Sequence, residues 1–342
     1  MYRVLRFFLF IFSPEAIHKI TIFLLKALHY VPCSGPILRA FFCTHSPALE
    51  RKVMGIKFKN PIGLAAGLDK NGSAYNEFAN FGFSFIEIGS ITPLSQPGNP
   101  KPRCFRLIQD QAIINRFGIN NKGVDKVVKN LRRRKPRVVV GGNIGKNTAT
   151  PNEKAIDDYE ATFTRLYGYV DYFVVNVSCP NVKDLCKLQD IDLLSGIIGR
   201  LTELRRLQDK YRPILIKISP DLSLEQVDTL IELVMAMGLD GIVATNTTTG
   251  REGLQTPPEQ VTAMGNGGLS GAPLKYKSLE IIKHIHTKSG GKLPIIGSGG
   301  VMTPLDALDM IQAGASLVQV YTGFIYQGPG LVKQILKMIE KE

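Results

Sequence analysis

The sequence predicts an α/β protein, a (β/α)8 TIM barrel with an N-terminal amphipathic helical extension. Two observations carry this prediction. After residue 60, short β-branched runs alternate with helical patterns, which gives eight strand–helix units in the rest of the chain. The first of these strands runs into its loop as GLAAGLDKNG, which lacks the GxGxxG turn of a doubly wound dinucleotide-binding sheet.

The composition bounds the possible functions. The chain has 342 residues, 44% of them hydrophobic and 21% charged, and can bury a sizeable core. Five cysteines, with no CxxC pair, argue against a disulfide scaffold and favour a reducing compartment. No histidine lies between residues 46 and 283, so we expect no metal site and no histidine-based triad there. The net charge of +13 suggests an anionic partner.

Residues 1–45 form the first predicted domain, an extension that is apolar, aromatic and basic. Ser13, Pro14 and Glu15 interrupt the apolar run, so it is too short to span a bilayer, and Ser13-Pro14 is typical of a helix start. We expect two amphipathic helices lying in a membrane interface. A pair of helices packed on the main domain is the alternative. Residues 46–342 form the predicted catalytic domain.

The barrel strands are predicted in chain order from short apolar, β-branched runs. The segment from Ile91 to Asn120 is long for a connection within a barrel and predicts a hairpin lid over the barrel mouth. The longest basic run, residues 132–137, is expected to be a solvated helix end. The eight strand candidates cover residues 61–67, 84–89, 137–145, 172–178, 213–219, 241–246, 293–300 and 317–323.

The predicted strand ends are polar, and active sites of such barrels form at the carboxyl ends of the strands. Gly299-Gly300 and Gly323 follow the last two strands, where backbone N–H groups often hold a phosphate. In order, the ends carry Asp69-Lys70, Ser90, Asn143, Asn176 with Cys179, Lys217, Thr245-Asn246, Ser298-Gly299-Gly300 and Tyr321-Thr322.

Lys217 lies inside the apolar strand ILIKI, so its ammonium group must face an anionic or electron-rich partner or lose its charge. Two chemistries are open on this evidence. The lysine could form a Schiff base, as in an aldolase. It could instead neutralise the electron-rich side of a reduced flavin.

Motifs spread from residue 60 to residue 330 resemble those of the dihydroorotate dehydrogenases, flavin enzymes of pyrimidine biosynthesis. The extension resembles the membrane-associated helices of the quinone-linked class 2 enzymes. In chain order the motifs are AAGLDKNG, EIGSITP, PGNPKPR, INRFGINN, NIGKN, NVSCPN, IKISPD, ATNTT, GGLSG, IIGSGG and VQVYTGF.

The resemblance implies a bound FMN and the substrate pair dihydroorotate and orotate. For FMN it implies contacts from Ala66, Gly67, Lys70, Ser90, Asn143, Asn176, Lys217, Thr245, Gly271, Gly300, Tyr321 and Thr322. For the substrate it implies Lys70, Asn115, Arg116, Phe117, Gly118, Ile119, Asn176, Asn181, Asn246 and Thr247. Asparagine amides both donate and accept, which suits the alternating edge of a pyrimidine ring.

The resemblance also implies that Cys179, in NVSCPN, is the catalytic base. Class 2 enzymes usually have serine here, and cysteine is typical of the soluble class 1 enzymes. The extension favours a membrane quinone as the electron acceptor, and the cysteine raises fumarate or NAD as the alternative. For a quinone, His18 and Arg103 are the expected polar contacts. The implied location is peripheral, at the cytoplasmic face of a bacterial inner membrane.

Three other functions compete with this interpretation. A flavin-dependent tRNA dihydrouridine synthase also has an active-site cysteine, but the asparagine set has no role there and no basic RNA-binding domain is evident, so we expect no nucleic-acid partner. A Schiff-base aldolase using Lys217 would bind no flavin. A non-enzymatic membrane adaptor would leave the polar strand ends unexplained.

Overall fold

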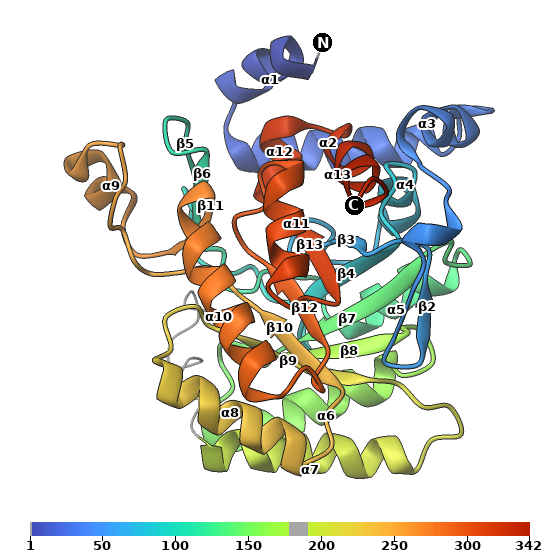
Figure 1. Ribbon diagram of the computed structural model, residues 1–342, viewed down its shortest axis with the longest axis vertical. Helices are drawn as coiled ribbons and strands as arrows, with labels where there is room; N and C mark the ends of the chain where they lie inside the picture. The colour runs from blue at the N-terminus through green and yellow to red at the C-terminus, as the bar shows by residue number, and fades with distance from the viewer. Residues whose placement is uncertain (1, 178–190) are drawn as a thin grey trace.

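The computed structural model describes residues 2–177 and 191–342. Its centre is a closed barrel of eight strands, each parallel to its neighbours, which confirms the predicted (β/α)8 barrel (Figure 1). Every strand of the barrel overlaps a segment predicted from the sequence. Around the barrel they are β3 (Ile62–Leu64), β4 (Phe85–Ile91), β7 (Val139–Ile144), β8 (Tyr172–Asn176), β9 (Ile214–Ile218), β10 (Gly241–Ala244), β12 (Ile295–Ser298) and β13 (Leu317–Val320).

Helices cover the outside of the barrel (Figure 1). In α8 the buried residues Val227, Leu230, Ile231 and Val234 recur at helical spacing, so one face packs on the barrel. A capping box between Ser223 and Gln226 fixes its start. The covering helices are α4 (Tyr75–Ala79), α5 (Val124–Arg132), α6 (Ala155–Leu166), α7 (Ile191–Arg206), α8 (Leu224–Ala236), α10 (Lys275–Lys288), α11 (Pro304–Gln312), α12 (Thr322–Gln327) and α13 (Leu331–Ile339).

The amino-terminal half of the barrel interior is apolar. The rings of Phe85 and Tyr172 occupy the space beside Gly63 and Gly141, where a Cβ would lie 2.3 Å and 2.2 Å from them. Phe58 closes this end, with its ring centroid 5.4 Å from that of Phe85. It belongs to a hairpin that the sequence did not predict, β1 (Arg51–Val53) with β2 (Ile56–Phe58). The floor is therefore sealed, and polar groups inside the barrel can meet a ligand only at the other end.

A three-stranded antiparallel sheet stands at the carboxyl end of the barrel. Strands β5 (Cys104–Leu107) and β6 (Ala112–Asn115) form the hairpin predicted between Ile91 and Asn120. Strand β11 (Gly268–Gly271) pairs with β6 across more than 150 residues of sequence. The short helix α9 (Pro258–Met264) precedes β11. This sheet supplies one wall of the cavity described below.

The extension contains three helices, α1 (Tyr2–Ile11), α2 (Pro14–Leu28) and α3 (Ser34–Phe42). The two predicted helices correspond to α2 and α3, and α1 is additional. Helix α2 starts as predicted, with Ser13 accepting a hydrogen bond from the Ala16 N–H and Pro14 in the first turn. Helix α1 docks on α12, because the hydroxyl of Tyr2 donates to the Ile325 carbonyl at 2.6 Å.

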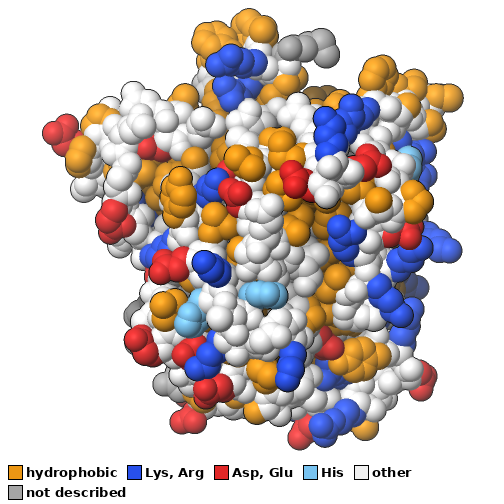
Figure 2. Space-filling model, in the orientation of Figure 1, with side chains coloured by type: hydrophobic (Ala, Val, Ile, Leu, Met, Phe, Trp, Pro, Cys, Tyr) orange, Lys and Arg blue, Asp and Glu red, His pale blue; other side chains and the backbone are white. Residues whose placement is uncertain are grey.

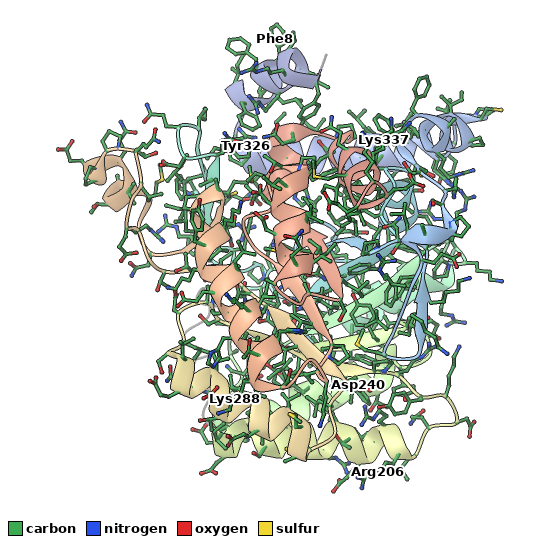
Figure 3. The ribbon with its side chains drawn as sticks, viewed as in Figure 1. Phe8, Arg206, Asp240, Lys288, Tyr326 and Lys337 are labelled. Carbon is green, nitrogen blue, oxygen red and sulfur yellow. The ribbon has the colours of Figure 1, made fainter. Side chains whose placement is uncertain are left out.

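The extension turns many apolar side chains to the surface. Figure 2 shows orange side chains over α1 and α3 and blue ones down the flank below α3. Phe8 of α1 points away from the barrel, whereas Tyr326 of α12 lies beneath this helix (Figure 3). Phe42 of α3 is only partly exposed, because its ring packs on Phe81 with centroids 5.4 Å apart. Within residues 2–177 and 191–342, no helix is long and apolar enough to cross a membrane.

Candidate active site

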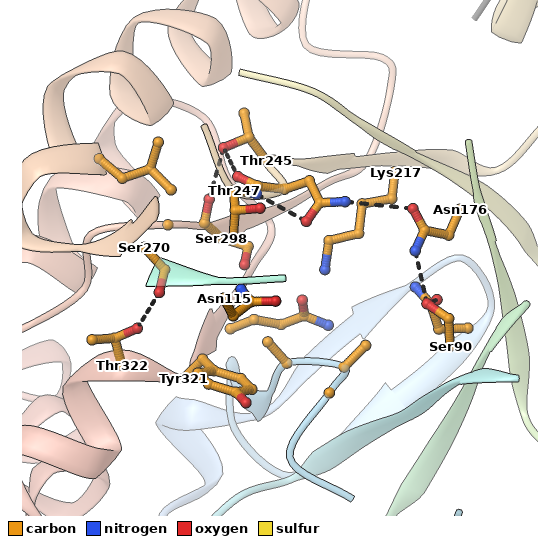
Figure 4. A pocket seen from close by; sticks show the side chains of 18 of the residues that line it. Ser90, Asn115, Asn176, Lys217, Thr245, Thr247, Ser270, Ser298, Tyr321 and Thr322 are labelled. Atoms are coloured by element: carbon orange, nitrogen blue, oxygen red, sulfur yellow. Dashed lines mark hydrogen bonds between the residues drawn. The ribbon is translucent and has the colours of Figure 1, made fainter. Parts of the chain in front are cut away.

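The carboxyl ends of the barrel strands open into a cavity of about 1040 Å³, including its mouth (Figure 4). The lining comes from the strand ends, the β5–β6–β11 sheet and the loop after β3. Most of the side chains predicted for a ligand meet here. They are Ala66, Gly67, Lys70, Ser90, Asn115, Phe117, Gly118, Ile119, Asn143, Asn176, Lys217, Thr245, Asn246, Thr247, Gly271, Gly300, Tyr321 and Thr322.

Amide and hydroxyl groups from four strand ends are joined in one hydrogen-bonded row. The Asn176 amide donates to Ser90 Oγ at 2.7 Å, and Ser90 donates to Asn143 Oδ1 (Figure 4). On the other side, Asn246 donates to Asn176 Oδ1 at 3.4 Å, and Asn246 Oδ1 accepts from the Thr247 N–H. The row holds its amides in fixed orientations, so the site is organised before a ligand arrives.

Lys70 brings a positive charge to the cavity from the loop after β3. Its Nζ lies 3.8 Å from the centroid of the Phe117 ring and donates to Asn120 Oδ1. The buried carboxylate of Asp69 accepts from the backbone N–H groups of Ser73 and Ala74 at 2.8 Å and 2.7 Å, which fixes the loop. A cation held over an aromatic ring at the cavity wall suits a carboxylate ligand.

Lys217 extends into the barrel interior and meets a buried acid. Its Nζ lies 3.8 Å from Oε1 of Glu87, which is fully buried. The same carboxylate accepts from the Asn143 amide at 2.7 Å and from the Gln319 amide at 2.6 Å. Sequence reasoning missed Glu87 and Gln319. Glu87 could have been found by the signal that revealed Lys217, a charge inside an apolar strand.

Glycines form a close-fitting cradle after β12 and β13. A Cβ on Gly300 would lie 2.3 Å from the Lys275 backbone, and one on Gly323 would lie 2.0 Å from the Val301 carbonyl. Gly299 and Gly300 have φ values of 113° and 82°, in the region that favours glycine. The Lys275 ammonium is bound to Asp306 and Asp309, at 2.6 Å and 2.9 Å. An anion in the cradle would therefore be held chiefly by backbone N–H groups.

Hydroxyl groups line the same side of the cavity. Thr322 and Ser270 share a hydrogen bond of 2.9 Å, which joins α12 to β11 (Figure 4). Thr245 and Ser278 share one of 3.0 Å. Burial raises the pKa of the Tyr321 phenol, so this group stays neutral and can donate a hydrogen bond.

Among the described residues predicted for the substrate, Arg116 is not brought to the cavity. Arg116 turns its side chain outward, and its guanidinium donates to the Pro102 carbonyl at 2.9 Å and 3.2 Å. This orientation arises because Arg116 follows β6 directly, and successive residues of a strand alternate between faces while Asn115 faces the cavity. Cys179 and Asn181 lie outside the described residues.

His18 and Arg103, predicted as quinone contacts, lie between the extension and the cavity wall. His18 Nε2 donates to the Leu68 carbonyl at 2.7 Å, two residues before Lys70. Arg103 binds the Glu15 carboxylate of α2 through two nitrogens, at 2.9 Å and 3.2 Å, and its guanidinium lies 5.5 Å from the Phe117 ring centroid. His18 thus connects α2 to the loop that carries Lys70, and Arg103 connects α2 to Phe117, which lines the cavity.

No group of three or more His, Cys, Asp or Glu side chains in the described part of the chain is arranged to hold a metal ion. The cavity instead combines a buried lysine–carboxylate pair, a row of amides and a glycine cradle. This set fits a planar cofactor with a phosphate tail and a small polar substrate.

Comparison with known proteins gives a consistent result. A family model described as dihydroorotate dehydrogenase matches residues 48–342. The chain is 49% identical to a dihydroorotate dehydrogenase (quinone) of Christiangramia forsetii, covering 100% of this chain and 99% of that protein. It is 46% identical to a protein of the same name from Coxiella burnetii, covering 99% and 96%.

Comparison with solved structures gives the same family. The chain superposes on the ligand-free DHODH of Eimeria tenella with a TM-score of 0.86 at 36% identity, over 96% of this chain and 95% of that one. The complex of that enzyme with ferulenol gives a TM-score of 0.85 at 37% identity, over 95% and 90%. Since these matches cover the extension as well as the barrel, the likeness is not limited to the catalytic domain.

Proposed function

The chain belongs to the dihydroorotate dehydrogenase family, and we propose that it oxidises (S)-dihydroorotate to orotate with FMN and passes the electrons to a membrane quinone. The observation that carries the proposal is the cavity itself. Lys217, the amide row and the glycine cradle meet there from separate strands of the barrel and their loops. The quinone in the names of its relatives supports the choice of acceptor.

The residues present fit FMN. Gly299, Gly300 and Gly323 line the cavity after β12 and β13, where backbone N–H groups could hold a phosphate, with the Thr322 hydroxyl beside them. Lys217, Ser90 and Asn143 would contact the ring system from the barrel interior. When bound, the flavin accepts the hydride that leaves dihydroorotate. The lysine supplies positive charge where a reduced flavin gains electron density.

The substrate would be held by charge and by amides. Lys70, over Phe117, would bind the carboxylate of dihydroorotate. Asn115, Asn176 and Asn246 present both donors and acceptors to the ring edge, and Asn181 is proposed from the sequence to join them. Because the amide row is hydrogen-bonded internally, the ring is oriented at little entropic cost.

Cys179 is proposed as the general base on sequence grounds. It follows the last residue of β8, Asn176, by three positions, and Asn176 lines the cavity. Its Sγ would take the proton from the carbon next to the one that loses hydride. A thiol with a free pKa of about 8.5 ionises far more readily than a serine hydroxyl.

The extension would place the enzyme at the membrane surface, at the cytoplasmic face of a bacterial inner membrane. Phe7, Phe8 and Phe23 are 69%, 56% and 70% exposed, which suits insertion of their rings at an interface. The basic run beyond α5 borders a groove that Leu28 and Val31 also line, and its exposed side chains suit anionic headgroups. His18 and Arg103 are proposed as contacts of the quinone head.

Spectroscopy of the purified protein tests the function. We expect it to carry a flavin spectrum, to release FMN on denaturation, and to lose its visible absorbance when dihydroorotate is added without oxygen. Addition of a short-chain quinone should restore the absorbance faster than fumarate or NAD. Absence of flavin, or of bleaching, would contradict the reaction. Faster reoxidation by fumarate or NAD would favour the soluble-acceptor alternative that Cys179 raises.

A further inference from the structure

Glu87 is a fully buried carboxylate inside the barrel, one layer below the cavity. It lies on β4, where inward-facing residues alternate with outward-facing ones, and Ile86 and Ile88 on either side pack toward the helices. Beneath it are the rings of Phe85 and Tyr172, in the apolar floor of the barrel. A carboxylate in such surroundings is costly unless it is paired and hydrogen-bonded.

Each contact of Glu87 leads to a residue of the cavity. Oε1 accepts from the Asn143 amide at 2.7 Å and lies 3.8 Å from Lys217 Nζ, while Oε2 accepts from the Gln319 amide at 2.6 Å. Among the described residues, Lys217 is its only ion-pair partner. Asn143 in turn accepts from Ser90, which accepts from Asn176. The amide row therefore ends on this buried charge.

We propose that Glu87 is a positioning residue that serves as the counter-ion of Lys217 and so sets the charge presented to the flavin. The inference rests on the proposed function, since it concerns the cofactor of that reaction. With the pair intact, the lysine is fixed in direction and its charge is largely balanced. Without the carboxylate, a full positive charge would stand beneath the cofactor, at low dielectric.

The variant Glu87→Gln isolates this charge. The buried Oε1 of Gln319 has no hydrogen-bond partner in the described part of the chain, so rotating that amide lets it accept from the amide that the substitution introduces. Shape and hydrogen bonds can thus be kept while the charge is removed. Thr162→Val is the control, because the Thr162 hydroxyl is buried, has no hydrogen-bond partner in the described part of the chain and does not line the cavity.

The first measurement is the two-electron midpoint potential of the flavin-loaded protein, taken by dye equilibration. Glu87→Gln should favour the reduced flavin by about tenfold or more, which corresponds to a rise of about 30 mV. Lys217→Met should shift the potential in the opposite direction, because it leaves the carboxylate unbalanced. Thr162→Val should leave the potential unchanged. A Glu87→Gln potential equal to that of the parent protein would overturn the inference.

The second measurement needs no flavin. Urea unfolding of the parent, Glu87→Gln, Lys217→Met and the double variant forms a double-mutant cycle. The double variant should be more stable than Lys217→Met alone, because it removes the unpaired buried carboxylate. Additive effects would contradict the pairing. If no protein in the set binds flavin, the proposed function fails, while the cycle still decides whether Glu87 and Lys217 are coupled.

Discussion

At the scale of single residues, the cavity contains two lysines in different surroundings. Lys217 is buried in the barrel and balanced by Glu87, whereas Lys70 stands at the wall, over Phe117. Because Lys217 is buried and paired, its ammonium group can interact only with a ligand bound against it at the bottom of the cavity. A lysine on an aromatic ring at the wall can reach an incoming carboxylate, so the two ammonium groups suit the cofactor and the substrate respectively.

Lys70→Met should therefore weaken orotate binding by about 10- to 100-fold, as expected when a charge-assisted hydrogen bond of about 1.5–3 kcal/mol is lost. Titration of the flavin spectrum with orotate gives the dissociation constant. Lys122→Met is the matched control, because Lys122 is exposed, lies close in the fold and does not line the cavity. Equal orotate affinity in parent and Lys70→Met would show that the carboxylate binds elsewhere.

Cys179→Ala should slow flavin reduction by dihydroorotate by at least about 100-fold, the usual contribution of a general base. Flavin content should not change. Cys179→Ser should retain part of the rate, with its pH profile displaced upward, since a hydroxyl is the weaker base at neutral pH. Anaerobic stopped flow measures both. Near-normal reduction in the alanine variant would remove Cys179 from the mechanism.

The two buried charges also show what the sequence alone could predict. Lys217 was singled out because a lysine inside ILIKI must have a partner, and FIEIG gives the same signal for Glu87. That the two meet at 3.8 Å could not be predicted, because β4 and β9 are not neighbours in the barrel. Arg116 shows a limit of motif resemblance, which predicts a position in the chain and not the direction of its side chain.

At the scale of elements, α2 is joined to the site by two contacts of different strength. Arg103 is held by the Glu15 carboxylate through two nitrogens, and this interaction lowers the pKa of Glu15. His18 makes a single bond to the Leu68 carbonyl, and burial lowers the pKa of its imidazole. The second contact depends on pH in the range where enzymes are assayed, so it can be tested by titration.

The lowered pKa of His18 determines how the stability of the fold changes with pH. In the unfolded chain His18 binds a proton below a pH of about 6.5, whereas the folded protein resists protonation. Stability is therefore fully present above that value and is lost as the pH falls toward the lowered pKa, at no more than about 1.4 kcal/mol per pH unit. His18→Gln keeps a donor for Leu68 and should show a shallower loss of unfolding free energy between pH 7 and 5. Parallel curves for the two proteins would contradict this.

Local sequence patterns predicted the strands of the barrel well, but they predicted the elements outside the barrel poorly. Helix α1 was missed because the run from Phe7 to Phe12 is continuously apolar and too short for its pattern to separate a helix from a buried strand. Its docking on α12 supplies the missing constraint. Strand β11 pairs with β6 from far along the chain, and β1 and β2 are only three residues each. Such pairings depend on tertiary contacts that no short window contains.

At the scale of the whole molecule, the exposed apolar helices lie at one end and α7 at the other (Figure 1). The double variant Phe8→Glu/Phe23→Glu should bind phospholipid vesicles about 10-fold or more weakly. Each change removes an aromatic ring that is exposed on the protein and would insert into the membrane interface. Leu207→Glu is the control, since Leu207 is 78% exposed just beyond the end of α7. Vesicle sedimentation measures the bound fraction. Equal losses in both proteins would indicate nonspecific adhesion.

This polarity also divides the catalytic cycle into two half-reactions with different structural needs. The residues proposed for reduction of the flavin lie at the barrel mouth and outside the extension, so a chain that starts at Ser46 should be reduced by dihydroorotate at a rate close to that of the full protein. Reoxidation by a hydrophobic quinone should be slowed by about 10-fold or more, because a lipid-soluble acceptor has to reach the flavin from the interface that α1–α3 provide.

Stopped flow times the two steps separately, and a water-soluble oxidant such as ferricyanide serves as the control for reoxidation. If the truncated, flavin-loaded protein reacts with the quinone as fast as the full chain, the extension is not the quinone's route. If reduction is lost as well, the contacts of α2 with Leu68 and Arg103 are needed to organise the substrate site itself.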